Sequence, residues 1–185
     1  GSEMCIRDRA MDRKIVQKEQ GDQILIYPAQ YYYLELNTAR MLRELDIFCP
    51  EDEKIVERRI VQIEKETGTV LDEMQKKAVQ EAAGHGLLIL TGGPGTGKTT
   101  IIYVIKEVYK RLYPEQQCIF LAPTGRAATK ISESTNEDAR TEHSFLKLYN
   151  DAPELENEVL IENSLVVVDE FSMTCLLYTS PSPRD

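Results

Sequence analysis

The stretch "GLLILTGGPGTGKTTIIYVI", residues 86–105, decides which fold class this 185-residue sequence favours. Residues 86–91 form an apolar run, which is typical of a strand buried inside a parallel sheet. Residues 92–99 follow with the spacing G-x-x-x-x-G-K-[ST], and the next residues predict a helix that ends near Pro114. A strand, a glycine-rich loop and a helix in this order predict an α/β fold.

The loop has the composition that a phosphate-binding site requires. Glycines allow the backbone N–H groups to turn inward around phosphates, and the new helix directs its positive end to the same place. We therefore expect Lys98 to contact the β- and γ-phosphates of a nucleoside triphosphate, and the Thr99 hydroxyl to bind Mg²⁺. The expected nucleotide-binding residues are Gly93, Pro94, Gly95, Thr96, Gly97, Lys98, Thr99 and Thr100. The alternative is a glycine-rich turn without a ligand, and the complete motif in its strand–helix context argues against it.

Two carboxylates follow a second apolar run, "LVVVDE", 71 residues after Lys98. They are expected at the carboxyl edge of the sheet, where ligands bind in such folds. Asp169 is predicted to hold Mg²⁺, and Glu170 to orient and deprotonate an attacking water as a general base. A solvated acidic strand end is the alternative. Together the two motifs predict a P-loop NTPase with helices flanking a parallel sheet.

The other segments fit this architecture. Residues 10–68 are predicted to form a small, mostly helical segment before the ATPase domain, and Val56, Ile60 and Ile63 should share one buried helix face within it. Residues 69–174 are predicted to form the ATPase domain. Its further elements are expected to be a helix over about 71–83, a buried strand over 118–123, a short helix over 125–134, a helix over 141–150 and a buried strand over 165–170.

The two ends of the chain do not fit the domain. Codons can be chosen for residues 1–9 whose reverse complement encodes Cys175 to Ser182 in order. The DNA behind both ends therefore resembles one sequence in opposite orientations, such as the adaptor of a transposase-based sequencing library. We expect residues 1–9 and 175–185 to be adaptor-derived, and we exclude them from the fold.

Composition limits the class of protein. The net charge of −9 argues against broad coating by nucleic acid, although a local DNA track through Arg126, Lys130, Arg140 and Lys147 remains open. Outside the two ends, Cys49 and Cys118 have no metal-ligand spacing. No apolar run is long enough to span a membrane, and no signal pattern precedes the domain. We expect a cytoplasmic protein with no membrane partner.

Five blocks carry a family resemblance. In order they are "GTVLDEMQKKAV", "LTGGPGTGKTT", "LAPTGRAATKISE", "ARTEHSFL" and "VVVDEFSM", within about residues 69–173. This series resembles the RecD-like DNA helicases of superfamily 1. The resemblance implies a RecA-like motor domain that couples hydrolysis of Mg·ATP to movement along single-stranded DNA, usually 5′ to 3′, with single-stranded or tailed duplex DNA as the partner.

The resemblance also implies roles for individual residues. Gln75 matches the glutamine that hydrogen-bonds adenine, since a carboxamide offers both a donor and an acceptor. The first expected contact with single-stranded DNA comprises Thr124, Gly125 and Arg126. Thr141 and His143 match a second DNA contact, although Glu142 and Ser144 depart from the family pattern beside it. Without the resemblance, His143 would be interpreted as a packed core histidine.

The chain is expected to be C-terminally truncated within its first motor domain. In the family, a second domain supplies the arginine that stabilises the transition state, and this sequence holds no candidate for it after Met173. The fragment is therefore expected to bind Mg·ATP poorly and to unwind nothing, whereas the parent protein is expected to be a helicase. The alternatives are another P-loop DNA-repair ATPase, a nucleotide-binding module without hydrolysis, or the motor subunit of a helicase–nuclease complex similar to exodeoxyribonuclease V alpha. Protein partners stay unknown.

Overall fold

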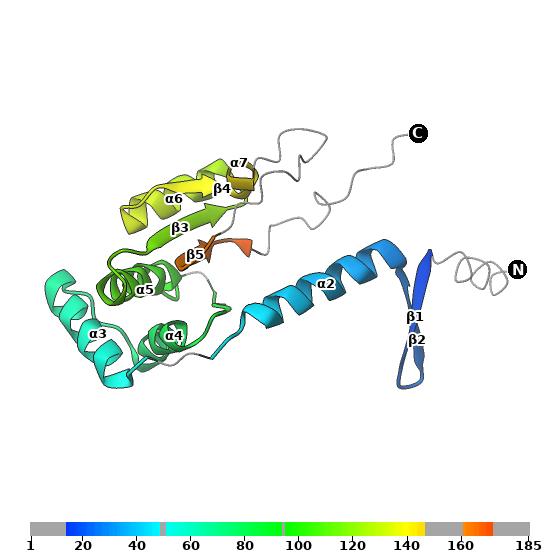
Figure 1. The fold of residues 1–185 in the computed structure, drawn as a ribbon, viewed down its shortest axis with the longest axis horizontal. Helices are drawn as coiled ribbons and strands as arrows, with labels where there is room; N and C mark the ends of the chain where they lie inside the picture. The colour runs from blue at the N-terminus through cyan, green and yellow to red at the C-terminus, as the bar shows by residue number, and fades with distance from the viewer. Residues whose placement is uncertain (1–13, 49–50, 94, 147–160, 172–185) are drawn as a thin grey trace, which may run out of the picture. The chain divides into compact units, whose positions relative to one another are not determined.

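The computed structural model describes residues 14–48, 51–93, 95–146 and 161–171, and the chain divides into two compact units between Ile47 and Phe48. Figure 1 shows the order of the elements along the chain. Several predictions fall outside the described residues. They concern the two ends that are expected to be adaptor-derived, Cys49, Pro94, the predicted helix beyond Leu146 with Lys147, and the segment 172–174.

The first unit is a hairpin followed by one long helix. β1 (Ile15–Gln20) pairs antiparallel with β2 (Gln23–Pro28), and α2 (Ala29–Leu45) follows. Gly21 takes a φ of +59° in the two-residue connection between the strands. A two-residue turn of this kind requires a positive φ, which glycine adopts without strain. The "mostly helical" prediction therefore missed β1, whose turn signal is the Gly-Asp pair at 21–22.

α3 (Glu53–Thr67) belongs to the second unit, although the sequence grouped it with the preceding segment. The predicted face is confirmed, because Val56, Ile60 and Ile63 are each no more than 2 % exposed. These side chains pack in one core with residues of α4 (Glu73–Gly84) and α5 (Lys98–Leu112). Burial of that face against the ATPase helices is the physical reason why the boundary lies before α3 and not after it.

A parallel sheet forms the second layer. Its strands are β3 (Gln117–Ala122), β4 (Ala139–Thr141) and β5 (Ser164–Val168), in the order β4-β3-β5. α6 (Gly125–Thr135) connects β3 to β4, and α7 (Glu142–Leu146) follows β4 (Figure 1). Phe120 and Ala122 of β3 are buried together with Ala128 and Ile131 of α6. The predicted α/β fold with helices beside a parallel sheet is confirmed.

A buried lysine joins α5 to α6. Lys106 is 4 % exposed, and its Nζ donates to the carbonyl of Thr135 at 2.9 Å. Its charge is paired with Glu107 at 2.7 Å. A buried ammonium group requires such partners, and here one of them is a carbonyl at the negative end of α6. The contact holds the phosphate-loop helix against the helix that begins with Gly125.

Two strand predictions need correction. Residues 87–91 form no strand, and Ile89 is 73 % exposed. An apolar run provides side chains for burial, but a strand forms only where its backbone N–H and C=O groups pair with a neighbouring strand. Residues 87–91 pair with none of the described strands. β5 was expected to be buried, yet it pairs only with β3 and lies at an edge of the described sheet, so Val166 is 39 % exposed. The three-residue strand β4 was not predicted.

Within the described residues, no helix combines the length and the apolar character needed to cross a membrane.

Candidate nucleotide site and nucleic-acid groove

The phosphate loop has the backbone geometry that its glycines predict. Gly95 and Gly97 take φ values of +77° and +78°, in the left-handed region that other residues rarely adopt. Gly97 caps the N-terminus of α5, and its carbonyl accepts the first helical hydrogen bond from Ile101 at 2.9 Å. The loop therefore leads into the positive end of a 15-residue helix, where anions bind favourably.

Lys98 folds back over the loop. Its Nζ donates to the carbonyls of Gly92 at 2.6 Å and Gly93 at 2.9 Å, and Thr96 Oγ1 donates to the carbonyl of Gly93 at 2.9 Å. These bonds hold the ammonium group beside the loop. A phosphate that enters must replace the carbonyl acceptors with its own charged oxygens, which form stronger hydrogen bonds with an ammonium group.

Gln75 lies against the same loop. Its Nε2 donates to the carbonyl of Thr96 at 3.4 Å, across 21 residues of sequence. A Cβ atom added to Gly97 would come within 2.6 Å of this nitrogen. The structure thus brings the residue predicted for adenine beside the residues predicted for phosphate.

Replacement of Gly97 by alanine is expected to disrupt this arrangement. The substitution combines strain at a positive φ with a collision against Gln75, so nucleotide affinity should fall about tenfold or more, which corresponds to at least about 1.4 kcal/mol. Gly68→Ala is the matched control, because Gly68 takes a φ of +72° and has no atom within 4 Å of the added Cβ. Calorimetric titration with Mg·ATP measures the difference. Equal affinities in the two variants would contradict the role of the Gln75 contact.

The predicted carboxylates follow β5 at the carboxyl edge of the sheet. The backbone N–H of Asp169 donates to the carbonyl of Leu121 at 3.0 Å, and the side chain of Asp169 is half-buried. Glu170 is exposed and takes a φ of +54°. A left-handed glutamate is uncommon and strained, and such conformations concentrate at functional sites. Nothing in the sequence signalled this backbone conformation.

α5 packs against β5, so the helix that begins with Lys98 lies beside the strand that leads to Asp169. No hydrogen bond or ion pair joins Lys98 to either carboxylate within the described residues. Thr99 is exposed at the start of α5. Among the described residues, no three His, Cys, Asp or Glu side chains cluster as a metal site. Mg²⁺ fits the donors present, since it commonly takes one or two protein oxygens and completes its shell with phosphates and water.

Two threonines begin the helices that follow β3 and β4. Thr124 Oγ1 accepts from the N–H of Ala127 at 3.3 Å, and Thr141 Oγ1 accepts from the N–H of Ser144 at 3.2 Å. Both are capping bonds of the kind that Thr supplies at a helix start. Because β3 and β4 are parallel, the two threonines lie at the same edge of the sheet.

A groove of about 460 Å³ joins the two predicted DNA-contacting segments. Its lining comprises Gly125, Ala128, Thr129, Ser132, Ala139, Arg140, Thr141 and Ser144. Gly125 and Thr141 are therefore brought together, whereas Thr124, Arg126 and His143 are not part of the lining. Thr124 and Arg126 are exposed nearby in sequence, and His143 is half-buried. Thr129 and Ser132 were missed, although their i+4 and i+7 spacing from Gly125 on a helix was a usable signal.

Comparison with known proteins places the chain in a family. A family model described as an AAA domain matches residues 75–180, which is more than half of the chain. The chain belongs to the AAA domain family. The match begins at Gln75 and includes the phosphate loop, the groove and both carboxylates.

The relatives of this AAA domain include a DNA helicase and subunits of the RecBCD enzyme. It is similar to an ATP-dependent RecD2 DNA helicase of Deinococcus radiodurans, at 36 % identity over 103 residues, which covers 56 % of this chain and 14 % of the relative. It is also similar to the RecBCD enzyme subunit RecD of Haemophilus influenzae, at 30 % identity over 161 residues, which covers 74 % of this chain and 24 % of the relative. The RecD subunit of Mycobacterium tuberculosis is 35 % identical over 69 residues, covering 35 % of this chain and 12 % of that protein. The resemblance to RecD-like helicases is confirmed, and the chain spans a quarter or less of these relatives.

Proposed function

We propose that this AAA domain is part of an ATP-dependent DNA helicase, which couples Mg·ATP hydrolysis to movement along single-stranded DNA in the 5′ to 3′ direction. A nucleotide site alone is common to many ATPases. The observation that carries the proposal is the groove between Gly125 and Thr141 in the same domain as the phosphate loop. The similarity to the RecD2 DNA helicase, and to a RecD subunit, supports it.

At the nucleotide, each group has a distinct task in the proposal. The Lys98 ammonium leaves the carbonyls of Gly92 and Gly93 and binds the β- and γ-phosphates. Thr99 and Asp169 would hold Mg²⁺, which supplies positive charge to the phosphate oxygens when bound. The carboxylate of Glu170 orients the attacking water and accepts its proton. Gln75 recognises the adenine base.

At the nucleic acid, the groove offers small and hydroxyl side chains to a phosphate backbone. Gly125 allows close approach, Thr129 and Ser132 present hydroxyl groups along α6, and Arg140 supplies positive charge. Arg126 is exposed beside this groove in sequence and adds a second charge. A local track of this kind is compatible with a net charge of −9, because the contact depends on charges near the phosphates.

These 185 residues alone are proposed to bind Mg·ATP poorly and to unwind no DNA, since they span 14 % of the RecD2 helicase and 24 % of the RecD subunit. In the proposal, a second motor domain provides an arginine worth on the order of 10³–10⁵ in rate. The RecBCD names of several relatives favour one alternative, the motor subunit of a helicase–nuclease complex. The cytoplasmic location stays a prediction.

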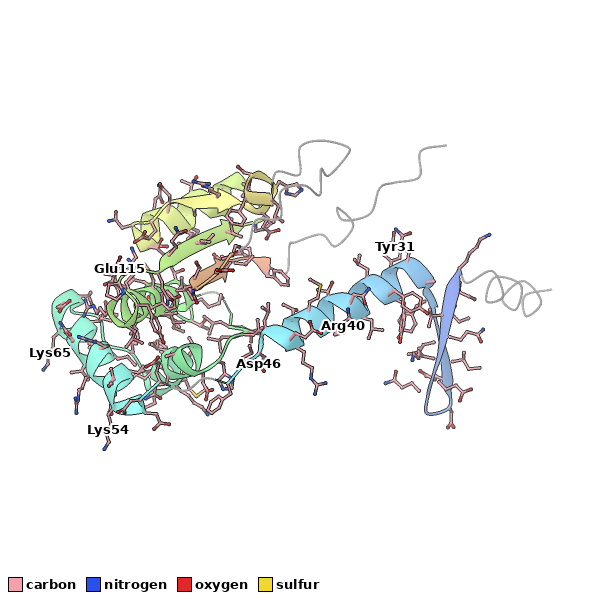
Figure 2. The ribbon with its side chains drawn as sticks, in the orientation of Figure 1. Tyr31, Arg40, Asp46, Lys54, Lys65 and Glu115 are labelled. Atoms are coloured by element: carbon pink, nitrogen blue, oxygen red, sulfur yellow. The ribbon has the colours of Figure 1, made fainter. Side chains whose placement is uncertain are left out.

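The test of the proposal is unwinding of a 5′-tailed duplex by a longer protein that carries these residues, with Arg126→Ala as the site variant. Loss of one phosphate contact should weaken the binding of single-stranded DNA of every sequence. It should also reduce the steepness of the plot of log K against log salt concentration by about 0.7. The control is Lys54→Ala, because Lys54 projects from α3 away from the groove residues (Figure 2).

Fluorescence anisotropy measures the binding, and a strand-separation assay measures the unwinding. Unchanged affinity and salt dependence in Arg126→Ala would remove this residue from the DNA contact. DNA-stimulated ATPase activity without strand separation would favour the alternative of a DNA-repair ATPase. Vigorous DNA-stimulated ATPase activity from the 185 residues alone would contradict the proposal that they need a second domain.

A further inference from the structure

The carboxamide of Gln75 has one defined orientation because α4 begins with a capping box. The backbone N–H of Asp72 donates to Gln75 Oε1 at 3.0 Å, and the backbone N–H of Gln75 donates to Asp72 Oδ1 at 2.8 Å. A backbone N–H can only donate, so the oxygen of the carboxamide must face it. Nε2 therefore faces the phosphate loop, where it donates to the carbonyl of Thr96 at 3.4 Å.

In this orientation, Gln75 keeps one acceptor and one donor with which it can bind a nucleotide base. The Gln75 carbonyl retains a second lone pair, and its amide retains a second N–H. Adenine presents a 6-amino donor next to the N7 acceptor, and a 6-oxopurine presents acceptors at both positions. A carboxamide held in this way matches the adenine edge, whereas a 6-oxo group would face the carbonyl oxygen of Gln75.

Rotation of the carboxamide by half a turn would be needed to offer an N–H to the 6-oxo group. That rotation would place the Nε2 donor against the N–H of Asp72 and remove the capping bond at 3.0 Å. It would also turn Oε1 toward the carbonyl of Thr96, so that two acceptors face each other. Both ends of the side chain therefore oppose the rotation.

We propose that the backbone N–H of Asp72 is the positioning group that makes the nucleotide site selective for 6-aminopurines over 6-oxopurines. It touches no nucleotide and acts through Gln75. The absence of a side chain on Gly97 completes the arrangement, because a Cβ there would come within 2.6 Å of Nε2. This inference rests on the proposed ATP site at Lys98.

Two substitutions of Asp72 distinguish the effect of its backbone N–H from the effect of its side chain. Asp72 has a φ of −75°, which proline adopts, so Asp72→Pro removes both the N–H and the capping carboxylate. Asp72→Ala removes only the carboxylate and keeps the N–H. Gln75→Glu is the second test variant, since a glutamate at this helix position also closes a capping box but lacks the amide donor. Circular dichroism and thermal melting compare the folding of all variants.

The measurement is calorimetric titration of a longer protein that carries these residues, because the 185 residues alone are proposed to bind Mg·ATP poorly. The titrants are Mg·ATP, Mg·ITP and Mg·tripolyphosphate, the last as a probe without a base. We expect the preference for ATP over ITP to fall about tenfold in Asp72→Pro relative to Asp72→Ala, as for the loss of one hydrogen bond. Tripolyphosphate affinity should agree within about twofold between these variants, because the phosphate loop is intact. Gln75→Glu should lose the same preference while its helix content is retained.

Three results would overturn the inference. The first is an unchanged ATP-to-ITP ratio in Asp72→Pro. The second is an equal loss of ATP and tripolyphosphate affinity in that variant, which would show a merely structural role. The third is an ATP-to-ITP affinity ratio in Gln75→Glu that equals the wild-type ratio. This result tests the inference even if Asp72→Pro does not fold. A longer wild-type protein that binds neither ATP nor tripolyphosphate would instead refute the proposed nucleotide site, and the inference with it.

Discussion

Lys98→Ala is expected to abolish ATP-driven unwinding in a longer protein that carries this domain. The ammonium group lies within 2.9 Å of two carbonyls of the loop that is expected to bind phosphate. Its removal deletes a charge-assisted contact to the β- and γ-phosphates, which strengthens as charge develops during transfer. The expected loss in kcat/KM for ATP is about 10²–10³-fold.

The matched control is Lys65→Ala, because Lys65 is an exposed lysine of α3 (Figure 2) outside the phosphate loop. It removes the same charge and should leave kcat/KM within about twofold, as for most surface substitutions. A coupled assay of ATP hydrolysis with saturating single-stranded DNA makes the comparison. Unwinding that survives in Lys98→Ala would overturn the assignment of the loop.

Glu170→Gln is expected to separate chemistry from binding in the same longer protein. The substitution keeps the size of the side chain at the strained position and removes the group proposed to accept the proton of water. General-base catalysis contributes about 10²–10⁴-fold, so kcat should fall by that factor. The affinity for Mg·ATP should change little, because Glu170 is not predicted to touch the phosphates.

Glu162→Gln serves as the control near the opposite end of the same strand. Glu162 is exposed before the start of β5, at the end opposite to Glu170, and carries the same charge. Single-turnover hydrolysis and equilibrium binding of Mg·ATP distinguish the two effects. Equal kcat values for Glu170→Gln and the wild type would exclude Glu170 as the base, and an equal loss of affinity and kcat would indicate a structural role instead.

Predictions based on local patterns agree best with the structure. The face of Val56, Ile60 and Ile63 is buried because helical spacing alone places these side chains together. The positive φ values of the loop follow from its glycines, since few other residues adopt them. The family resemblance pointed to Gln75 through its motif, and the structure places this residue beside the loop.

Predictions that depended on distant partners agree less well. Residues 87–91 have the composition of a buried strand, yet a strand needs a neighbour to accept its hydrogen bonds, and composition does not name that neighbour. The unit to which α3 belongs was misjudged for a similar reason. Only the packing of its apolar face against α4 and α5 shows where it lies.

By itself, the sequence determined the chemistry available to this protein: a glycine loop, one lysine, two carboxylates and the order of the motifs that relate it to RecD-like helicases. These are local properties, because spacing along the chain is enough to express them. Only the tertiary structure decided the orientation of the Gln75 carboxamide and the groove shared by Gly125 and Thr141. The groove, and the contact of Gln75 with Thr96 that adds to its local capping bond, join segments separated in the chain. Those contacts form only when the core brings the segments together.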